Sequence, residues 1–400
     1  MNPRRALAFI FCTVALDVLA LGVMIPVLPR IVLGFMDGDT AGAAEMFGVF
    51  ATVWALMQFL CSPLLGALSD RYGRRPVILI SCLGLDYIFM ALAPSLLLLF
   101  VGRVVSGITS ATIGTSFAYI ADVTKPEERA RAFGLVGMAF GLGFVVGPAI
   151  GGLLGGLDPR LPFRGLRRGL SRQCGVRVVR ATRIAAAGKR MAFSWKRANP
   201  VGSLKLLASQ RQLLGLASVD FLGSFAHQVL PAVFVLYAGH RYGWGKPTVG
   251  LTLAFVGVCS AVVQGLLIGP IIRRIGAREA VVGSLLAGAT GMSIYGLAAT
   301  GPWFWAGVPV MALWGMAGPA LQDMMTRHVG GSEQGQLQGA TSASRSVAGL
   351  IAPGIFAVLF AGTTDTVPGA AFLLAGGLLA AAALTTWFVT ARTRPAARVP

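Results

Sequence analysis

Long apolar stretches recur along the chain, and short polar or charged connections separate them. A helix that crosses a bilayer needs roughly 20 mostly apolar residues. Eleven stretches meet that length, near residues 6–28, 46–66, 77–95, 97–120, 133–156, 212–238, 248–271, 280–300, 303–322, 343–362 and 368–390. Glycine and proline are frequent within them, which membrane helices tolerate because neighbouring helices satisfy the freed backbone groups. The pattern therefore predicts an all-α polytopic membrane protein.

The connections alternate in charge, and this alternation predicts the orientation in the membrane. Basic residues precede the first stretch and follow the second, the fourth and the last, whereas the link after the first stretch is acidic. Cytoplasmic loops carry an excess of lysine and arginine. We therefore expect the N-terminus, the C-terminus and every link from an even to an odd helix to lie in the cytoplasm.

A short pattern near residue 70 recurs in the second half of the chain. The segment from Gly66 to Arg75 reads GALSDRYGRR, and the segment from Gly269 to Arg278, 203 residues later, reads GPIIRRIGAR. Two parallel copies of a multi-helix unit are typical of transporters. Parallel copies need an even number of helices each, yet only five stretches precede residue 160. We expect an N-terminal bundle over 1–158 with helices 1–5, a basic segment over 159–205, and a C-terminal bundle over 206–400 with helices 7–12.

Composition agrees with a membrane protein, but the net charge does not at first sight. Hydrophobic residues make up 55% of the chain and charged residues 12%, whereas soluble domains carry about 25% charged residues. The formal net charge is nevertheless +19, and twelve of the lysines and arginines lie within 159–199, which has no acidic residue. A basic surface can bind nucleic acid, but no soluble module remains to present one. The basicity is thus largely local, and we expect no nucleic-acid partner.

The basic block stands where a sixth membrane helix is expected. Residues 163–185 contain seven arginines, and each would cost about 2.5–3.5 kcal/mol at the centre of a membrane helix. Two interpretations stay open. The block is a genuine amphipathic or disordered segment attracted to anionic lipid, or helix 6 has been scrambled by two compensating frameshifts over 164–192. Translating the coding DNA in the other frames separates them, because the second interpretation requires an apolar run there.

Several motifs give the chain a family resemblance. Gly66, Asp70, Arg71, Gly73, Arg74, Arg75 and Pro76 follow the order G-x-x-x-D-R-x-G-R-R-P; Gly147-Pro148 and Gly151-Gly152 lie in the fifth stretch, and Arg103 lies in the fourth. On these residues the chain resembles the drug:proton antiporters of the major facilitator superfamily. It is most similar to tetracycline efflux pumps, with MIPVLP at 24–29 and EQGQLQG at 333–339 among the matching stretches.

The resemblance implies two six-helix halves in the bacterial inner membrane and export of a drug, tetracycline first, in exchange for protons. Drug, protons and the lipid bilayer would be the partners, and no cofactor is expected because the proton gradient supplies the energy. The resemblance leaves room for a divalent cation carried by the drug. No catalytic or metal-binding constellation indicates an enzyme. The alternatives are an inactive or impaired product with a scrambled helix 6, and an exporter of another drug or metabolite.

Three ionisable residues inside apolar stretches are candidates for proton coupling. Asp17, Asp86 and Arg103 belong to helices 1, 3 and 4, and an ionisable group within the membrane is costly enough to suggest function. A carboxyl group taken out of water binds a proton more readily. It can therefore bind a proton when the cavity is open to one side and release it when the cavity opens to the other. The competing interpretation is a structural ion pair that holds helices together.

The segment around Asp70 is a candidate gate. Asp70 can cap the N-terminus of a second-half helix, which the resemblance identifies as helix 11, because a helix N-terminus attracts negative charge. Arg74 or Arg75 can pair with Asp122, while Gly66 and Gly73 permit tight packing and Arg71 adds charge. The four residues Gly147, Pro148, Gly151 and Gly152 would kink helix 5 and bring it close to the opposite half. Charges that only set topology, and ordinary kinked packing, are the competing interpretations.

Polar residues within helices are candidates for the drug site. Gln58, Gln264 and His227 could bind a polar drug or simply join helix to helix. Two positions depart from the tetracycline pumps that the chain resembles. Those pumps carry a histidine in helix 8, where Cys259 is the nearest polarisable residue here, and an acidic residue in helix 9, where Gly288 stands here.

Overall fold

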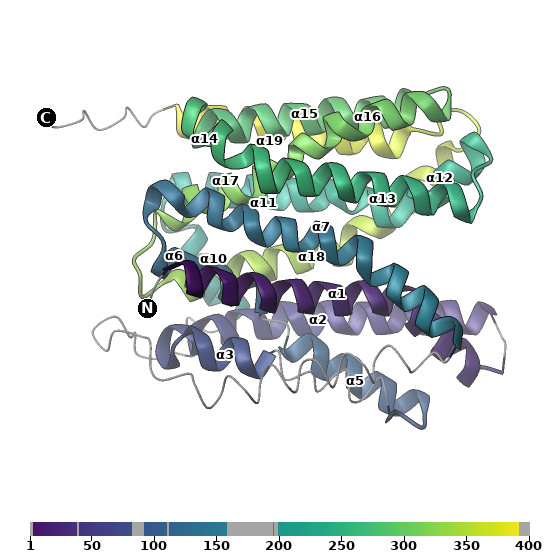
Figure 1. Ribbon diagram of the computed structural model, residues 1–400, viewed down its shortest axis with the longest axis horizontal. Helices are drawn as coiled ribbons and strands as arrows, with labels where there is room; N and C mark the ends of the chain where they lie inside the picture. Colours follow the sequence, from purple (N-terminus) through teal and green to yellow (C-terminus); the bar gives the residue numbers. More distant parts are fainter. Residues whose placement is uncertain are drawn as a thin grey trace, which may run out of the picture. The chain divides into compact units, whose positions relative to one another are not determined.

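The helices occur where the apolar stretches predict them. The computed structural model describes residues 3–37, 40–81, 92–109, 112–157, 195 and 199–391, and the described residues form helices and no strand. The first half contains α1 (Pro3–Phe35), α2 (Thr40–Tyr72), α3 (Arg74–Ser81), α5 (Leu96–Thr109), α6 (Thr112–Val123) and α7 (Pro126–Leu157). The second half contains α10 (Pro200–Leu207), α11 (Arg211–His227), α12 (Val229–Tyr242), α13 (Lys246–Val262), η2 (Val263–Leu267), α14 (Ile268–Ile275), α15 (Ala277–Leu297), α16 (Gly301–Leu313), η3 (Trp314–Met316), α17 (Ala317–Thr326), α18 (Gln334–Thr363) and α19 (Ala370–Thr390) (Figure 1).

Eight helical segments of the described residues are long and apolar enough to cross a membrane. Several combine two or three elements in one span: α11 with α12, α13 with η2 and α14, and α16 with η3 and α17. The prediction of an all-helical polytopic membrane protein is confirmed. Asp86 and nearly all of the basic block 159–199 lie outside the described residues, so the expectations for helix 6 stay predictions.

The chain folds into two compact units. Unit 1 comprises residues 1–125, 138–204 and 329–346, and unit 2 comprises residues 126–137, 205–328 and 347–400. Two long helices contribute to both units, because α7 begins in unit 2 and α18 begins in unit 1. The units therefore do not follow the order of the sequence.

The core of unit 1 forms where α1 packs against α2 and α5. Ala20, Val23 and Val27 of α1 recur at helical spacing, so they share one face. They are buried in one cluster with Phe50 of α2 and Leu99 of α5. Such packing orients α1 and α5, which carry Asp17 and Arg103.

Unit 2 is built around α15, which packs against both α16 and α19 (Figure 1). The ring of Tyr295 stacks on Phe304 of α16 with 4.0 Å between the ring centroids. The hydroxyl of Tyr237 donates a hydrogen bond to the backbone oxygen of Tyr295 at 2.8 Å. These contacts hold α12, α15 and α16 together at one end of the unit.

The internal repeat is visible in the backbone. Gly73 is the single residue between α2 and α3, and its φ is 100°. Gly276 is the single residue between α14 and α15, and its φ is 90°. Only glycine adopts such angles without strain. The two helix–turn–helix segments thus share a turn residue at matching positions of the 203-residue repeat.

Several helices begin earlier than the apolar pattern predicts, and the differences are largest for α18 and α7. Helix 11 was expected from residue 343, but α18 begins at Gln334, and helix 5 was expected from residue 133, but α7 begins at Pro126. The first turns of α18 are polar yet buried, with Gln334, Gln336 and Gln338 all less than 6% exposed. Hydropathy misses them because they pack against protein rather than lipid.

Candidate functional site

The carboxylate of Asp70 caps the N-terminus of α18. Its Oδ1 accepts a hydrogen bond from the backbone N–H of Gly335, and its Oδ2 accepts one from the backbone N–H of Gln336, both at 2.8 Å. The first N–H groups of a helix have no partner within the helix and carry partial positive charge. Asp70, at the end of α2, therefore binds the start of a second-half helix, as expected for helix 11.

Arg74 connects two carboxylates across the first half of the chain. Its Nη1 donates to Oδ1 of Asp70, and its Nε donates to Oδ2 of Asp122 at 2.9 Å. The Arg74 and Asp70 side chains are 6% and 2% exposed, whereas Asp122 is 32% exposed. Burial alone lowers the pKa of the Arg74 guanidinium, but the two carboxylates outweigh it and hold the pKa above its ordinary value. The guanidinium is therefore charged. We call Asp70, Arg74, Asp122 and the capped N–H groups the Asp70 cluster.

Backbone and hydroxyl groups complete the Asp70 cluster. Arg74 Nη1 also donates to the Ser69 hydroxyl at 2.8 Å, and Ser69 in turn donates to the backbone oxygen of Gly66 at 2.8 Å. Gly66 lies directly against Gly335, where an added Cβ would overlap the Gly335 carbonyl group. Two glycines thus let α2 and α18 approach closely enough for Asp70 to reach the helix terminus.

The other residues of the motif lie around this cluster. Arg71 is exposed, with its guanidinium 5.1 Å from the centroid of the Tyr72 ring. Of the two arginines expected as partners of Asp122, Arg74 makes the contact, and the side chain of Arg75 lies outside the described residues.

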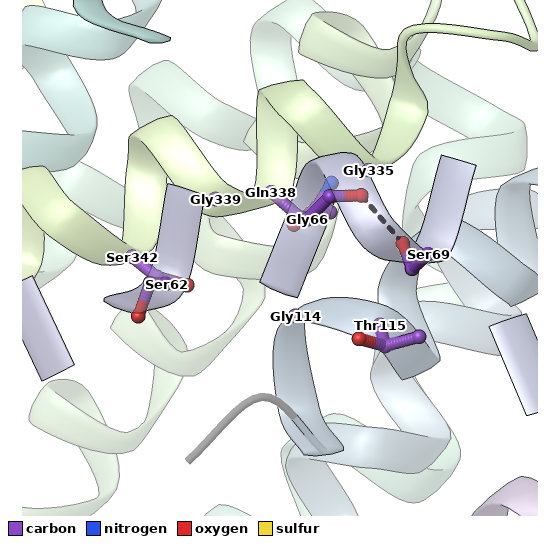
Figure 2. A pocket seen from close by; sticks show the side chains of 9 residues that line it. All are labelled: Ser62, Gly66, Ser69, Gly114, Thr115, Gly335, Gln338, Gly339 and Ser342. Carbon is purple, nitrogen blue, oxygen red and sulfur yellow. Dashed lines mark hydrogen bonds between the residues drawn. The ribbon is translucent and has the colours of Figure 1, made fainter. Parts of the chain in front are cut away.

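A small polar pocket adjoins the Asp70 cluster within unit 1. Figure 2 shows the side chains that line it from α2, α6 and α18, among them Ser62, Thr115, Gln338 and Ser342. Ser62 Oγ and Gln338 Nε2 are buried without a hydrogen-bonding partner among the described residues. The size and polarity suit ordered water rather than a drug.

Arg103 is buried on α5 and contacts two other helices. Its Nη1 lies 3.0 Å from the Met24 sulfur of α1, and its guanidinium lies 5.6 Å from the centroid of the Trp54 ring of α2. Asp17 is half-buried on α1, two turns before Met24 and about 10 Å from it along the helix axis. Arg103 is thus placed next to the helix that carries one proposed proton carrier, while Asp86 lies outside the described residues.

Gly147, the first residue of the helix 5 motif, packs against a helix of the first half of the chain. Gly147 lies against Gly22 of α1, where an added Cβ would come within 2.7 Å of the Gly22 Cα. Helix α7 continues through Pro148, Gly151 and Gly152 to Leu157. Gly147 therefore brings α7 close to a helix of its own half. The part of α7 that approaches a second-half helix is its start, where Gly134 and Gly137 lie against Gln264 and Ile268.

The three candidate drug-binding residues lie in different surroundings. Gln58 Oε1 accepts a hydrogen bond from the Ser346 hydroxyl of α18 at 3.0 Å, within unit 1. His227 is exposed at the end of α11, and its ring centroid lies 5.8 Å from that of Trp314. Gln264 is half-buried in η2. Of the three residues expected to contact the drug, Gln58 thus already joins two helices by a hydrogen bond.

Trp314 explains the glycine in helix 9. An added Cβ at Gly288 would meet the Trp314 ring at 2.8 Å and Leu379 at 3.0 Å. The indole of Trp314 therefore occupies the space that an acidic side chain would need.

Cys259 is half-buried on α13, in contact with the apolar cluster of Val263 and Ile268.

Two charged positions inside helices were missed by the sequence interpretation. Asp323 of α17 is 1% exposed and pairs with Arg327 at 2.7 Å, and Arg345 is half-buried in α18. Both Asp323 and Arg345 lie within segments that could cross a membrane. The rule that identified Asp17 and Arg103 applies to them too, because Arg345 lies within the expected stretch 343–362 and Asp323 directly follows the stretch 303–322.

Comparison with known proteins identifies relatives over nearly the whole chain. The family described as Major Facilitator Superfamily matches residues 7–353 and 216–400. A relative from Escherichia coli, "Tetracycline resistance protein, class C", is 37% identical over 385 residues, which cover 94% of this chain and 95% of the relative. "Tetracycline resistance protein, class E", also from Escherichia coli, is 34% identical and covers 97% of this chain and 95% of the relative.

A solved structure has the same fold. The crystal structure of the human organic anion transporter MFSD10 (TETRAN) superposes with a TM-score of 0.86 over 96% of this chain and 100% of that chain. Its sequence is 21% identical, so this likeness concerns the arrangement of helices alone.

Proposed function

The chain belongs to the Major Facilitator Superfamily, and on this premise we propose that it exports tetracycline in exchange for protons. It is a multi-pass membrane transporter of small molecules and not an enzyme. Identity to tetracycline resistance proteins over nearly the full length supports tetracycline as the substrate. A cell that carries the protein would resist the antibiotic.

The Asp70 cluster is the observation that supports alternating access. A buried carboxylate of α2 holds the N-terminus of α18, and a buried arginine neutralises it. Such contacts form in one arrangement of the helices and must break in another, which makes them a two-state element. The cluster would close the cytoplasmic side in this structure and open when the transporter faces inward.

Proton coupling would use the ionisable residues of the first half. Asp17 and Asp86 would bind protons from outside and release them to the cytoplasm. Arg103, buried near α1 and α2, would favour the ionised form of a nearby carboxylate and so promote release. Gln58, Gln264 and His227 would contact the drug, with any divalent cation entering as part of it. The N- and C-termini would lie in the cytoplasm, as the basic links indicate.

Uptake by inverted membrane vesicles tests this function. We expect tetracycline to accumulate when a proton gradient is imposed and to leave when an uncoupler removes the gradient. Vesicles without the protein are the control. Accumulation of a different drug alone would favour an exporter of another substrate, and no gradient-driven accumulation of either would contradict the proposal.

A second candidate, an impaired transporter, is favoured by the seven arginines within 163–185. We expect that replacing residues 164–192 with an apolar sequence of equal length increases tetracycline resistance at matched protein level. The physical reason is that seven arginines oppose insertion of helix 6. With five spans in the first half, the basic links of the second half would face the wrong side of the membrane. The minimal inhibitory concentration measures the gain. Full resistance from the unmodified chain, with no gain on replacement, would exclude impairment.

A further inference from the structure

A π-helical turn interrupts the eighth membrane helix at a candidate drug-binding residue. The turn η2 covers Val263–Leu267 and contains Gln264, between the regular helices α13 and α14. Turns of this kind are rare and are found mostly as single insertions at functional sites. The η2 turn packs against η3, the short 3₁₀ segment at Trp314–Met316 in the tenth helix. Two irregular turns thus meet within unit 2.

The side chain of Gln264 fits between two glycines. On one side, an added Cβ at Gly137 of α7 would overlap Oε1 of Gln264. On the other side, a Cβ at Gly315 of η3 would lie 3.3–3.4 Å from the Gln264 side chain, including its Nε2. Gly134, one turn before Gly137, lies against the backbone oxygen of Gln264. The amide therefore occupies space that exists only because residue 137 has no side chain.

Shape rather than hydrogen bonding holds the amide there. Gln264 is half-buried, and its amide makes no hydrogen bond to another described residue. Its neighbours Gly137 and Gly315 have no side chains that could bond to the amide. Leaving the contact with Gly137 for a polar ligand would restore hydrogen bonds to the amide. The resting position is thus one that a ligand can compete with.

We propose that Gly137 is a positioning residue that sets the affinity for the drug by storing the Gln264 amide against α7. The inference rests on the proposed function, in which Gln264 contacts the drug. Binding would draw the amide away from Gly137 and free the α7 surface that it covered. The free energy needed to move the amide away from Gly137 would then lower the affinity for the drug. The packing of α7 would change when the drug binds.

Four purified proteins test the proposal: the wild type, G137A, Q264A and the double variant. The Cβ of G137A meets the far end of a flexible side chain, so Gln264 can rotate away without distortion of the backbone. With the amide already displaced, we expect G137A to lower the Kd for tetracycline by about threefold to tenfold, the value of one net hydrogen bond. In the Q264A background the same substitution should leave the Kd unchanged. Fluorescence of bound tetracycline measures the Kd.

Thermal stability without drug provides a second and independent measurement. G137A should lower the Tm in the wild-type background, because the packed Gln264 is displaced. It should raise the Tm in the Q264A background, because the methyl group fills the space that the truncation leaves. Gly318→Ala is the control, since Gly318 lies just after η3 and has no atom within 4 Å of an added Cβ. Gly318→Ala should leave the Kd unchanged, and any shift in Tm should be the same in the wild-type and Q264A backgrounds.

The outcomes separate this inference from the proposed function. Equal shifts in Tm from G137A in both backgrounds would show that Gln264 does not occupy the contact, and would overturn the inference. If G137A shifts the Tm in opposite directions in the two backgrounds but leaves the Kd for tetracycline unchanged, the proposed role of Gly137 in drug affinity would be overturned. A wild type that does not bind tetracycline would contradict the proposed function, while the Tm measurements would still decide the Gln264 contact.

Discussion

Replacing Arg74 with alanine is expected to reduce gradient-driven tetracycline uptake by more than tenfold. The substitution leaves Asp70, whose side chain is 2% exposed, without its cation, and removes the link to Asp122. Breaking a buried ion pair on one side costs about 3–5 kcal/mol, and each 1.4 kcal/mol is a factor of about ten in an equilibrium. The closed arrangement, which contains the Asp70 cluster, would lose that stabilisation. Initial uptake rates in inverted vesicles at matched protein level measure the effect.

Arg274→Ala is the matched control for this prediction. Arg274 is exposed at the end of α14, and it stands at the position of Arg71 in the second copy of the repeat. Its removal should change uptake by less than about twofold, in line with small effects at exposed charges. Arg74→Lys should fall between, because lysine keeps the charge but cannot reach two carboxylates with one planar group. Wild-type uptake by Arg74→Ala would show that the Asp70 cluster does not control transport.

A single methyl group at Gly66 is expected to separate α2 from α18 and to abolish uptake. The added Cβ of Gly66→Ala would overlap the backbone carbonyl of Gly335, which cannot rotate away as a side chain can. Overpacking in a close contact costs about 1–3 kcal/mol or more, and here the shift also pulls Asp70 away from the N–H groups that it caps. We expect a lower Tm of the purified protein together with the loss of uptake.

The same helix offers a control for the Gly66 prediction. Gly48→Ala also adds a methyl group to α2, but no atom lies within 4 Å of the added Cβ. It should leave uptake unchanged and raise stability slightly, because alanine favours the helix by about 1 kcal/mol over glycine. Gly335→Ala, on the other side of the contact, should reproduce the Gly66 result. If Gly66→Ala behaved like Gly48→Ala, close approach of the two helices would not matter for function.

Local patterns explain why much of the fold was predictable. Apolar stretches of membrane length located the helices, because the bilayer sets both the length and the polarity of a span. The Asp70 motif could also be interpreted, because a carboxylate at the end of one helix needs a partner and a helix N-terminus supplies one. Local reasoning predicted that Asp70 caps a second-half helix, and the family resemblance implied helix 11. The hydrogen bonds to Gly335 and Gln336 show the geometry of this contact.

The polar starts of two helices could not be predicted from hydropathy. Gln334, Gln336 and Gln338 look like a loop in the sequence, yet they form the buried first turns of α18. Membrane helices need apolar residues only where they face lipid, and these turns face protein.

By itself, the sequence determined that this protein is a helical membrane protein, where most of its spans lie and which charged residues need partners, because solvation by lipid acts on each segment independently. The internal repeat and the motifs then indicated a transporter. Only the tertiary structure decided which partners those residues have. It places Arg74 on Asp122, Gly147 against α1, Trp314 over Gly288 and Gln264 against Gly137. Contacts of this kind depend on the distance between backbones of different helices, and no pattern within a single helix records that distance.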